Sequence, residues 1–237
     1  MTLAVENVTV RFGGITAVDD VSFVVPPGQV TGLIGPNGAG KTTTFNVITG
    51  LQQPNSGRVL LGDRDITALA PFKRARLGLG RTFQRLEVFG SLTARDNVRV
   101  ATEHHRDLTG RVVDPDALLA RVGAAHVADE QADALPTGLA RLVELARALA
   151  NEPSLLLLDE PGSGLGAAES EQLGDLLLDL AGSGTAVLLV EHDVDLVMRV
   201  CSEIAVLDFG AVIAQGTASQ VQRDPRVQAA YLGAAVA

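Results

Sequence analysis

The segment GPNGAGKT, residues 35–42, has the residue types and spacing of a phosphate-binding loop (Walker A), G-x-x-x-x-G-K-[ST]. Its glycines allow backbone N–H groups to turn toward a phosphate, and the helix expected to follow points its positive end at the same place. Lys41 would reach the outer phosphates of a nucleotide, and Thr42 would offer a hydroxyl to Mg²⁺. The sequence therefore predicts a site for ATP and Mg²⁺. The expected nucleotide contacts in this segment are Gly35, Pro36, Asn37, Gly38, Ala39, Gly40, Lys41, Thr42 and Thr43.

A second motif, LLLLDE at residues 155–160, places two carboxylates where a buried strand ends. The carboxyl ends of parallel strands are where ligands collect in α/β sheets. Asp159 is suited to hold the metal ion through water, and Glu160 is suited to polarise the water that attacks the γ-phosphate (Walker B). A solvated strand end is the alternative for an isolated pair of carboxylates. A neighbouring phosphate loop favours the catalytic interpretation, with Lys41 as a further catalytic residue.

Three more residues are ambiguous from their own types and positions. His192 follows another apolar run, residues 186–190, and a single histidine is more often structural than catalytic. Gln84 could be an ordinary polar residue at a strand end, and Phe12 could belong to the core. Their roles need support from outside these patterns.

The elements that must position these residues alternate between strands and helices. The patterns predict strands at residues 3–12, 21–25, 29–34, 57–61 and 155–158, at 186–190, and in a segment ending near Gln84, with a hairpin over 204–215. They predict helices near residues 41–49, 93–102, 116–122, 140–150, 167–180 and 194–200. Continuous apolar runs such as 155–158 are typical of parallel strands that are buried on both faces. Residues 234–237 are expected to be a frayed tail.

These elements predict an α/β fold: a P-loop NTPase core with a parallel sheet, an N-terminal antiparallel β subdomain and a helical insert. We expect a single domain over residues 1–237. Residues 1–91 and 151–237 would form the core with its β subdomain, and residues 92–150 the helical subdomain.

Composition limits the possible functions. Nineteen Lys and Arg stand against 28 Asp and Glu, a formal net charge of −9, and no long basic run occurs, so we expect no nucleic-acid partner. Cys201 is the only cysteine, which excludes an intramolecular disulfide. The N-terminus does not resemble a signal peptide, and the apolar runs are shorter than a membrane span. A role in membrane transport would therefore require a partner that supplies the pore.

Together these motifs resemble, over essentially the whole chain, those of ABC-transporter ATPase subunits. The resemblance implies that Phe12 stacks on adenine, that Gln84 senses the metal ion and the transmembrane partner, and that His192 contacts the γ-phosphate. It also places Val18 among the nucleotide contacts. Thr42, Gln84 and Asp159 are then the expected metal site.

Four segments narrow the resemblance to the ATPases of branched-chain amino-acid importers. They are RFGGITAVDDVSF, RTFQRLEVFGSLTARDNV, LVEHDVDLVM and DPRVQAAYLG. The implied function is to power import of branched-chain or related hydrophobic amino acids, on the cytoplasmic face of the cell membrane, through transmembrane permease subunits. Urea or amide import and lipopolysaccharide export remain alternatives. In such proteins the region of residues 84–92 docks on the permease, although Phe89 could equally be a packing residue.

The sequence departs from the family pattern in two places. ABC ATPases act as head-to-tail pairs, in which an LSGGQ-type signature of one subunit covers the nucleotide of the other. Here the equivalent is LPTGL, residues 135–139, where Pro136 has neither a hydroxyl nor an N–H. Gly166 stands where the family usually has an aspartate. We therefore expect a second ATPase subunit as partner, in a hetero-pair with a homodimer as the alternative, and low ATPase activity for the isolated chain.

Two other functional classes were weighed. A translation or nucleic-acid ATPase usually has two modules or coiled-coil insertions, and this chain has one module and an acidic balance. A protein that binds ATP without hydrolysing it would not need both Glu160 and His192. Comparing the turnover of Glu160→Gln with that of the unmodified chain separates this second class from an ATPase.

Overall fold

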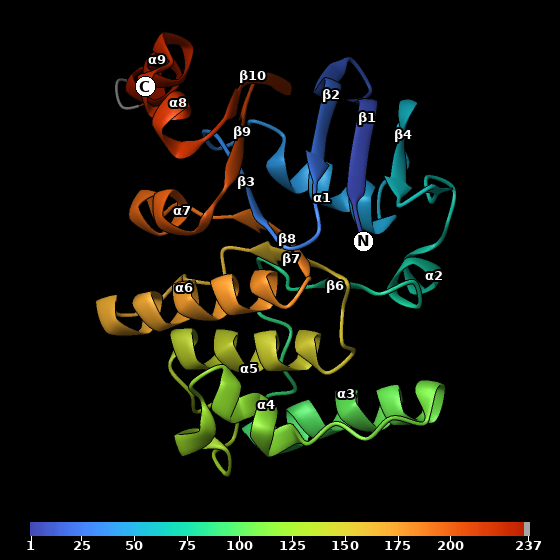
Figure 1. Cartoon of the computed structure of the whole chain (residues 1–237), viewed down its shortest axis with the longest axis vertical. Helices are drawn as coiled ribbons and strands as arrows, with labels where there is room; N and C mark the ends of the chain where they lie inside the picture. The colour runs from blue at the N-terminus through green and yellow to red at the C-terminus, as the bar shows by residue number, and fades with distance from the viewer. Residues whose placement is uncertain (235–237) are drawn as a thin grey trace.

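The computed structural model describes residues 1–234, which form two β-sheets and two groups of helices (Figure 1). The first sheet is antiparallel, with strand order β2-β1-β4-β5: β1 (Leu3–Phe12), β2 (Ile15–Val25), β4 (Ser56–Leu61) and β5 (Arg64–Asp65). The second has the order β10-β9-β3-β8-β7-β6: β3 (Val30–Ile34), β6 (Leu79–Arg81), β7 (Leu155–Asp159), β8 (Ala186–Val190), β9 (Glu203–Asp208) and β10 (Ala211–Gly216). All its neighbouring pairs are parallel except β9 with β10, which forms a hairpin.

The helices lie around and below the second sheet in Figure 1. They are α1 (Lys41–Thr49), α2 (Pro71–Ala75), α3 (Ala94–Thr109), α4 (Pro115–Arg121), α5 (Thr137–Leu149), α6 (Ala167–Gly182), α7 (Val194–Val200), α8 (Ala218–Arg223) and α9 (Pro225–Ala234), with a 3-10 turn at Ala125–Val127. Within residues 1–234, no helix combines the length and the apolar character needed to cross a membrane.

The leucine run of β7 explains how the core is divided. Leu156 and Leu158 pack in a cluster with residues of α3 to α7, whereas Leu155 and Leu157 pack in a second cluster with α1 and the antiparallel sheet. Successive side chains of a strand point to opposite faces, so an unbroken apolar run is what a strand between two cores requires. β8 follows the same pattern and pairs in parallel with both β7 and β3.

The predicted fold class is confirmed: an antiparallel sheet, a mainly parallel sheet and surrounding helices are all present. Most predicted elements are present, although α3 continues to Thr109 and β2 already begins at Ile15. Five elements were not predicted: β5, α2, the 3-10 turn at Ala125–Val127, α8 and α9. Of these, β5, α2 and the 3-10 turn are too short to show a clear periodicity. Of the expected tail, Ala234 ends α9 and residues 235–237 lie outside the described residues. The division at residues 91 and 150 remains a prediction.

Candidate functional site

The loop between β3 and α1 has a backbone that only glycine accommodates at two positions. Gly35 has φ of 149° and Gly40 has φ of 103°, both in the region that L side chains rarely adopt. A Cβ on Gly35 would lie 2.0 Å from the carbonyl oxygen of Leu207, and one on Gly40 would lie 2.6 Å from that of Ala17. The loop is therefore pressed against β9 and β2, and its turn ends at the start of α1.

Lys41 is buried at this turn, and its ammonium folds back over the loop. Its Nζ donates to the carbonyl oxygens of Gly35 at 2.6 Å and Pro36 at 2.9 Å. Burial lowers the pKa of Lys41, while the nearby carboxylates of Glu160 and Asp159 act in the opposite direction. The amine is thus held at the mouth of the loop, at the positive end of α1, where a phosphate would be bound.

Asp159 ends β7 and is almost fully buried. Its backbone N–H donates to Thr82 Oγ1 at 3.2 Å, and its Oδ2 lies 3.5 Å from a guanidinium nitrogen of Arg81. Burial raises the pKa of Asp159, and the charge of Arg81 partly offsets this effect. Oδ2 is buried yet has no hydrogen-bond partner among the described residues. Such an oxygen is suited to a hard cation or to its coordinated water.

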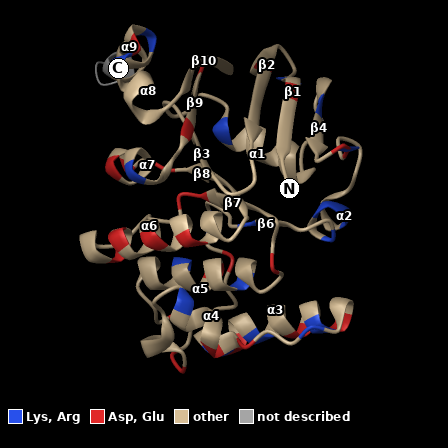
Figure 2. Ribbon diagram, viewed as in Figure 1, with Lys and Arg blue, Asp and Glu red and all other residues tan. Residues whose placement is uncertain are grey.

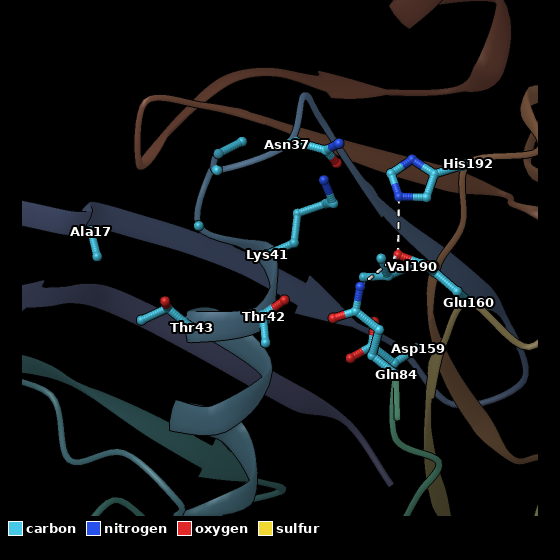
Figure 3. A pocket seen from close by; sticks show the side chains of 13 residues that line it. Ala17, Asn37, Lys41, Thr42, Thr43, Gln84, Asp159, Glu160, Val190 and His192 are labelled. Atoms are coloured by element: carbon cyan, nitrogen blue, oxygen red, sulfur yellow. Dashed lines mark hydrogen bonds and ion pairs between the residues drawn. The ribbon is translucent and has the colours of Figure 1, made fainter. Parts of the chain in front are cut away.

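Glu160, Gln84 and His192 converge on one point beside the loop (Figure 3). Glu160 Oε1 lies 3.0 Å from His192 Nε2 and accepts from Gln84 Nε2 at 3.3 Å. Glu160 has a φ of 53°, an uncommon value for a non-glycine residue, and its N–H donates to the carbonyl of Val190 at 2.8 Å. The carboxylate is therefore carried on a strained turn and held by residues from two other strand ends.

These residues surround a cavity of about 240 Å³. It is lined by Ala17, Asn37, Gly38, Ala39, Gly40, Lys41, Thr42, Thr43, Gln84, Asp159, Glu160, Val190 and His192. The structure thus brings most of the predicted site residues together from β2, the loop, α1 and the ends of β6, β7 and β8. An open polar cavity with buried cationic and anionic groups suits a charged ligand.

Four predicted contacts lie outside the lining: Phe12, Val18, Gly35 and Pro36. Phe12 is half-exposed at the end of β1, and the backbone of Pro36 serves Lys41 instead. Val18 is fully buried beneath Gly40, and its neighbour Ala17 lines the cavity. Consecutive residues of a strand face opposite sides, so Ala17 lines the cavity while Val18 packs in the core, and the nucleotide contact of Val18 stays a prediction.

The segment at residues 135–139 lies at the start of α5. Pro136 is the N-cap of this helix and forms no side-chain capping bond. Gly138 approaches Gly164 so closely that a Cβ would lie 2.6 Å from the Gly164 carbonyl oxygen. At Gly166 the backbone N–H donates to Glu169 Oε2 at 2.8 Å. A carboxylate from the first turn of α6 therefore lies beside residue 166, which has no carboxylate of its own.

Sequence reasoning missed several polar side chains that support the site. Arg141 of α5 donates to the carbonyl oxygens of Phe83 at 2.9 Å and Gln84 at 2.5 Å, and Glu144 accepts from the N–H of Phe83 at 3.2 Å. Arg81 donates to Asn46 Oδ1 of α1 at 2.9 Å. Polar residues on the buried face of α5 were the available signal. Their contacts are far apart in the sequence and could not be read from it.

The profile of the ABC transporter family matches residues 18–163, and that of the branched-chain amino acid ATP-binding cassette transporter family matches residues 211–237. The chain is 38% identical to the high-affinity branched-chain amino acid transport ATP-binding protein LivG of Escherichia coli K12, over 98% of both chains. It is 39% identical to the corresponding BraF protein of Pseudomonas aeruginosa, also over 98% of both. The lipopolysaccharide export system ATP-binding protein LptB of Haemophilus influenzae is 36% identical, over 98% of this chain and 97% of that protein.

Solved structures give the same picture. A nucleotide-free ATP-binding cassette from an ABC transporter superposes with a TM-score of 0.86 at 30% identity, covering 98% of this chain and 99% of that one. The ADP conformation of another cassette has a TM-score of 0.84 at 31% identity, with the same coverage. A dimeric cassette in a post-hydrolysis state, bound to ADP and Pi, has a TM-score of 0.82 at 26% identity, covering 91% and 98%.

Proposed function

The chain belongs to the family of ABC transporter ATP-binding subunits, and on this basis we propose that it powers a membrane importer of branched-chain or related hydrophobic amino acids. The observation that supports ATP hydrolysis most strongly is the convergence of Glu160, Gln84 and His192 beside the phosphate loop. The amino-acid substrate follows from the identities of 38% and 39% to LivG and BraF.

The loop and Lys41 bind the phosphates of ATP. Residues 38–42 line the cavity, and the ammonium of Lys41 exchanges its present carbonyl contacts for the β- and γ-phosphate oxygens. Phe12, exposed at the end of β1, is available to stack on adenine. Ordered backbone donors and a buried cation give this site its affinity without a broad basic surface.

Thr42 and Asp159, with the amide oxygen of Gln84, would hold Mg²⁺. They are oxygen donors of the kind this ion prefers, and the unpartnered Oδ2 of Asp159 fits the requirement. When bound, the ion neutralises charge on the phosphates. Arg81 and Thr82 keep Asp159 at the strand end, since Arg81 pairs with its carboxylate and the Thr82 hydroxyl accepts from its backbone N–H.

Glu160 activates water for attack on the γ-phosphate. Its carboxylate accepts the proton of the water as the new O–P bond forms and the bond to ADP breaks. His192, 3.0 Å from Glu160, holds the carboxylate in line and contacts the γ-phosphate from the opposite side of the cavity. The residues that act on the γ-phosphate thus come from the ends of β7 and β8.

The partner of this chain is a second ATPase subunit of a different sequence. Pro136 offers no N–H and no hydroxyl to the nucleotide of a neighbour, so a homodimer would have two weak sites. A partner with an intact signature would complete the site of this chain. Low turnover by the purified chain, and a rise on mixing with the second subunit, would support the hetero-pair; strong cooperative turnover by the chain alone would argue against it.

The permease subunits dock beside Phe89. Its ring is 47% exposed and faces the guanidinium of Arg147 at 4.7 Å, while its backbone is fixed to Asn97 by two hydrogen bonds. A neighbouring cavity of about 390 Å³ is lined by Phe72, Phe83, Glu87 and Arg147, among others. Figure 2 shows basic residues in α2, the helix that contributes Pro71, Phe72 and Ala75 to this lining. A rigid backbone that carries an exposed ring is typical of a docking site.

Phe89→Ala tests this surface against Leu108→Ala, another exposed apolar residue at the far end of α3. We expect loss of permease association only for Phe89→Ala, with ATP binding retained. Equal association of both variants would make Phe89 a packing residue.

Transport itself is tested by reconstituting the chain in liposomes with the permease subunits encoded beside its gene. Import of labelled leucine that depends on ATP and stops with Glu160→Gln would support the proposal. The LptB similarity of 36% keeps lipopolysaccharide export as the second candidate, and extraction of lipopolysaccharide in place of leucine import would favour it.

A further inference from the structure

Glu191 is a buried carboxylate that the proposed mechanism does not use. It is the first residue after β8, and only 7% of its surface is exposed. Its Oε1 accepts from the N–H of Gly162 at 2.6 Å, and its Oε2 accepts from the N–H of His192 at 3.0 Å. Both oxygens are therefore bonded to backbone donors rather than to a cation, which is unusual for a buried charge.

The two donors belong to the two loops that carry the proposed catalytic residues. Gly162 lies two residues after Glu160, and His192 follows Glu191 directly. On the cavity side, Glu160 and His192 meet through their side chains at 3.0 Å. On the buried side, the Glu191 carboxylate joins the same two loops through their backbones. The two loops are thus connected twice, by side chains at the cavity and by the Glu191 carboxylate in the interior.

The fit around Glu191 is close. A Cβ on Gly162 would lie 2.9 Å from Glu191 Oε1, so a larger residue at position 162 would require the Glu191 carboxylate to shift. Glu160 itself depends on this arrangement, since its N–H bonds Val190, the residue before Glu191. Hydrogen bonds to an ionised acceptor are roughly twice as strong as neutral ones, which makes this a firm attachment.

We propose that Glu191 is a positioning residue for hydrolysis, which holds the loop of Glu160 at a fixed distance from His192 through the backbone N–H groups of Gly162 and His192. This inference rests on the proposed function, because it assigns Glu191 a role in the site of Glu160 and His192. Displacing a catalytic group by about 1 Å can cost on the order of a hundredfold in rate, so a carboxylate that sets this distance affects turnover without touching the substrate.

Burial does not make Glu191 a stabilising residue. Burial raises the pKa of this carboxyl, and the backbone hydrogen bonds only partly offset the effect. Above its ordinary pKa the folded chain therefore holds the charged form at a cost in stability. Replacing the carboxylate by an amide removes that cost, so Glu191→Gln should fold and bind ATP normally.

The test uses Glu191→Gln, whose amide can accept from only one of the two N–H groups and presents its NH₂ to the other. The matched control is Glu203→Gln, a half-buried carboxylate on β9 that bonds Gln215 away from the cavity. In the transporter assembled with its permease and second ATPase subunit, we expect kcat to fall about tenfold in Glu191→Gln, with KM for ATP within about twofold. Glu203→Gln should keep the original kcat.

Two readouts separate positioning from a general structural role. In a His192→Ala background, Glu191→Gln should cause no further loss, because the distance that it sets no longer matters. In the isolated full-length chain, the NMR signal of the His192 ring should move in Glu191→Gln and stay in place in Glu203→Gln. The inference would be overturned if the losses in kcat of Glu191→Gln and His192→Ala multiplied in the double variant, or if the His192 signal did not move in Glu191→Gln. Turnover of the unmodified transporter and its loss in Glu160→Gln report separately on the proposed function.

Discussion

The phosphate-loop region and the signature segment at residues 135–139 are equipped very differently in this chain. In the first, a buried lysine, two carboxylates, a glutamine and a histidine surround one cavity. In the second, the start of α5 offers a proline N-cap without a side-chain capping bond, next to the glycine at position 138. The first region holds the groups that we propose for hydrolysis, and in the second Pro136 provides neither an N–H nor a hydroxyl.

The difference shows that the two regions are under separate physical demands. The cavity is assembled from the ends of β6, β7 and β8 and from α1, so each residue there is held by the core of the same chain. The signature segment lies only at the start of a helix, and its backbone N–H groups would find their acceptors on the nucleotide of another subunit. A weak signature therefore leaves the cavity of its own chain intact. The signature that completes this cavity would have to come from the second subunit.

The largest expected effect is at the equipped region. Glu160→Gln should lower kcat at least about a hundredfold, because the amide cannot accept the proton of the attacking water. ATP affinity should remain, since the loop and Lys41 are untouched. Steady-state turnover and ATP binding by the assembled transporter check this, with the exposed α6 residue Glu171→Gln as control. Turnover that survives in Glu160→Gln would mean that the two regions do not differ as proposed.

A smaller change should make the two regions more alike. Pro136→Ser adds an N–H and a hydroxyl at a backbone conformation, φ −53° and ψ 148°, that serine adopts without strain. Hydrogen bonds to charged groups contribute about 1.5–3 kcal/mol, so we expect the isolated chain to hydrolyse ATP at least about tenfold faster. Pro115→Ser, at the first turn of α4, is the control. An unchanged rate would locate the weakness elsewhere in residues 135–139.

Arg141 connects the helix that begins at the signature segment to the backbone of Gln84 at the cavity, and a stability measurement tests this connection. Arg141 of α5 holds the backbone of Phe83 and Gln84, and its loss would remove one of the two arginines whose charges act on the buried Glu144. Arg141→Met should lower the free energy of unfolding by about 2 kcal/mol. The control is Arg99→Met, which removes an exposed ion pair with Asp96 and should change the free energy of unfolding by less than about 0.5 kcal/mol. Urea unfolding of both variants measures these free energies. Equal stabilities would show that Arg141 does not link the two regions.

The smallest effect is expected at Gly166, the N-cap of α6. Its φ of −76° and ψ of 172° are open to any residue, and aspartate is a preferred N-cap. Gly166→Asp should raise the free energy of unfolding by only a few tenths of a kcal/mol, because Glu169 already accepts from the N–H of residue 166. Thermal unfolding gives this value. A large loss of stability would show that residue 166 packs more tightly than its backbone indicates.

The sequence predicted the fold class and the main elements because their patterns are local and strong. The leucine run at residues 155–158 predicted a doubly buried strand, and the glycines around Lys41 predicted the loop and helix. The nucleotide contact at Val18 stays a prediction: in the structure the preceding residue Ala17 lines the cavity, and only the path of β2 decides which of two consecutive side chains does so. The sequence indicated no role for Glu191 or Arg141, because their partners lie 29 and 57 to 58 residues away.

The sequence by itself determined the type of ligand, through G-x-x-x-x-G-K-[ST] and the paired carboxylates, because those residue types are needed wherever a phosphate and a metal ion are held. It also determined that position 136 of the signature segment has neither an N–H nor a hydroxyl, since proline has neither in any fold. Only the tertiary structure decided that Glu160, Gln84 and His192 meet, and that a buried carboxylate fastens two of their loops. Those contacts depend on which strands are neighbours in the sheet, and the order β3-β8-β7-β6 is set by packing between distant segments.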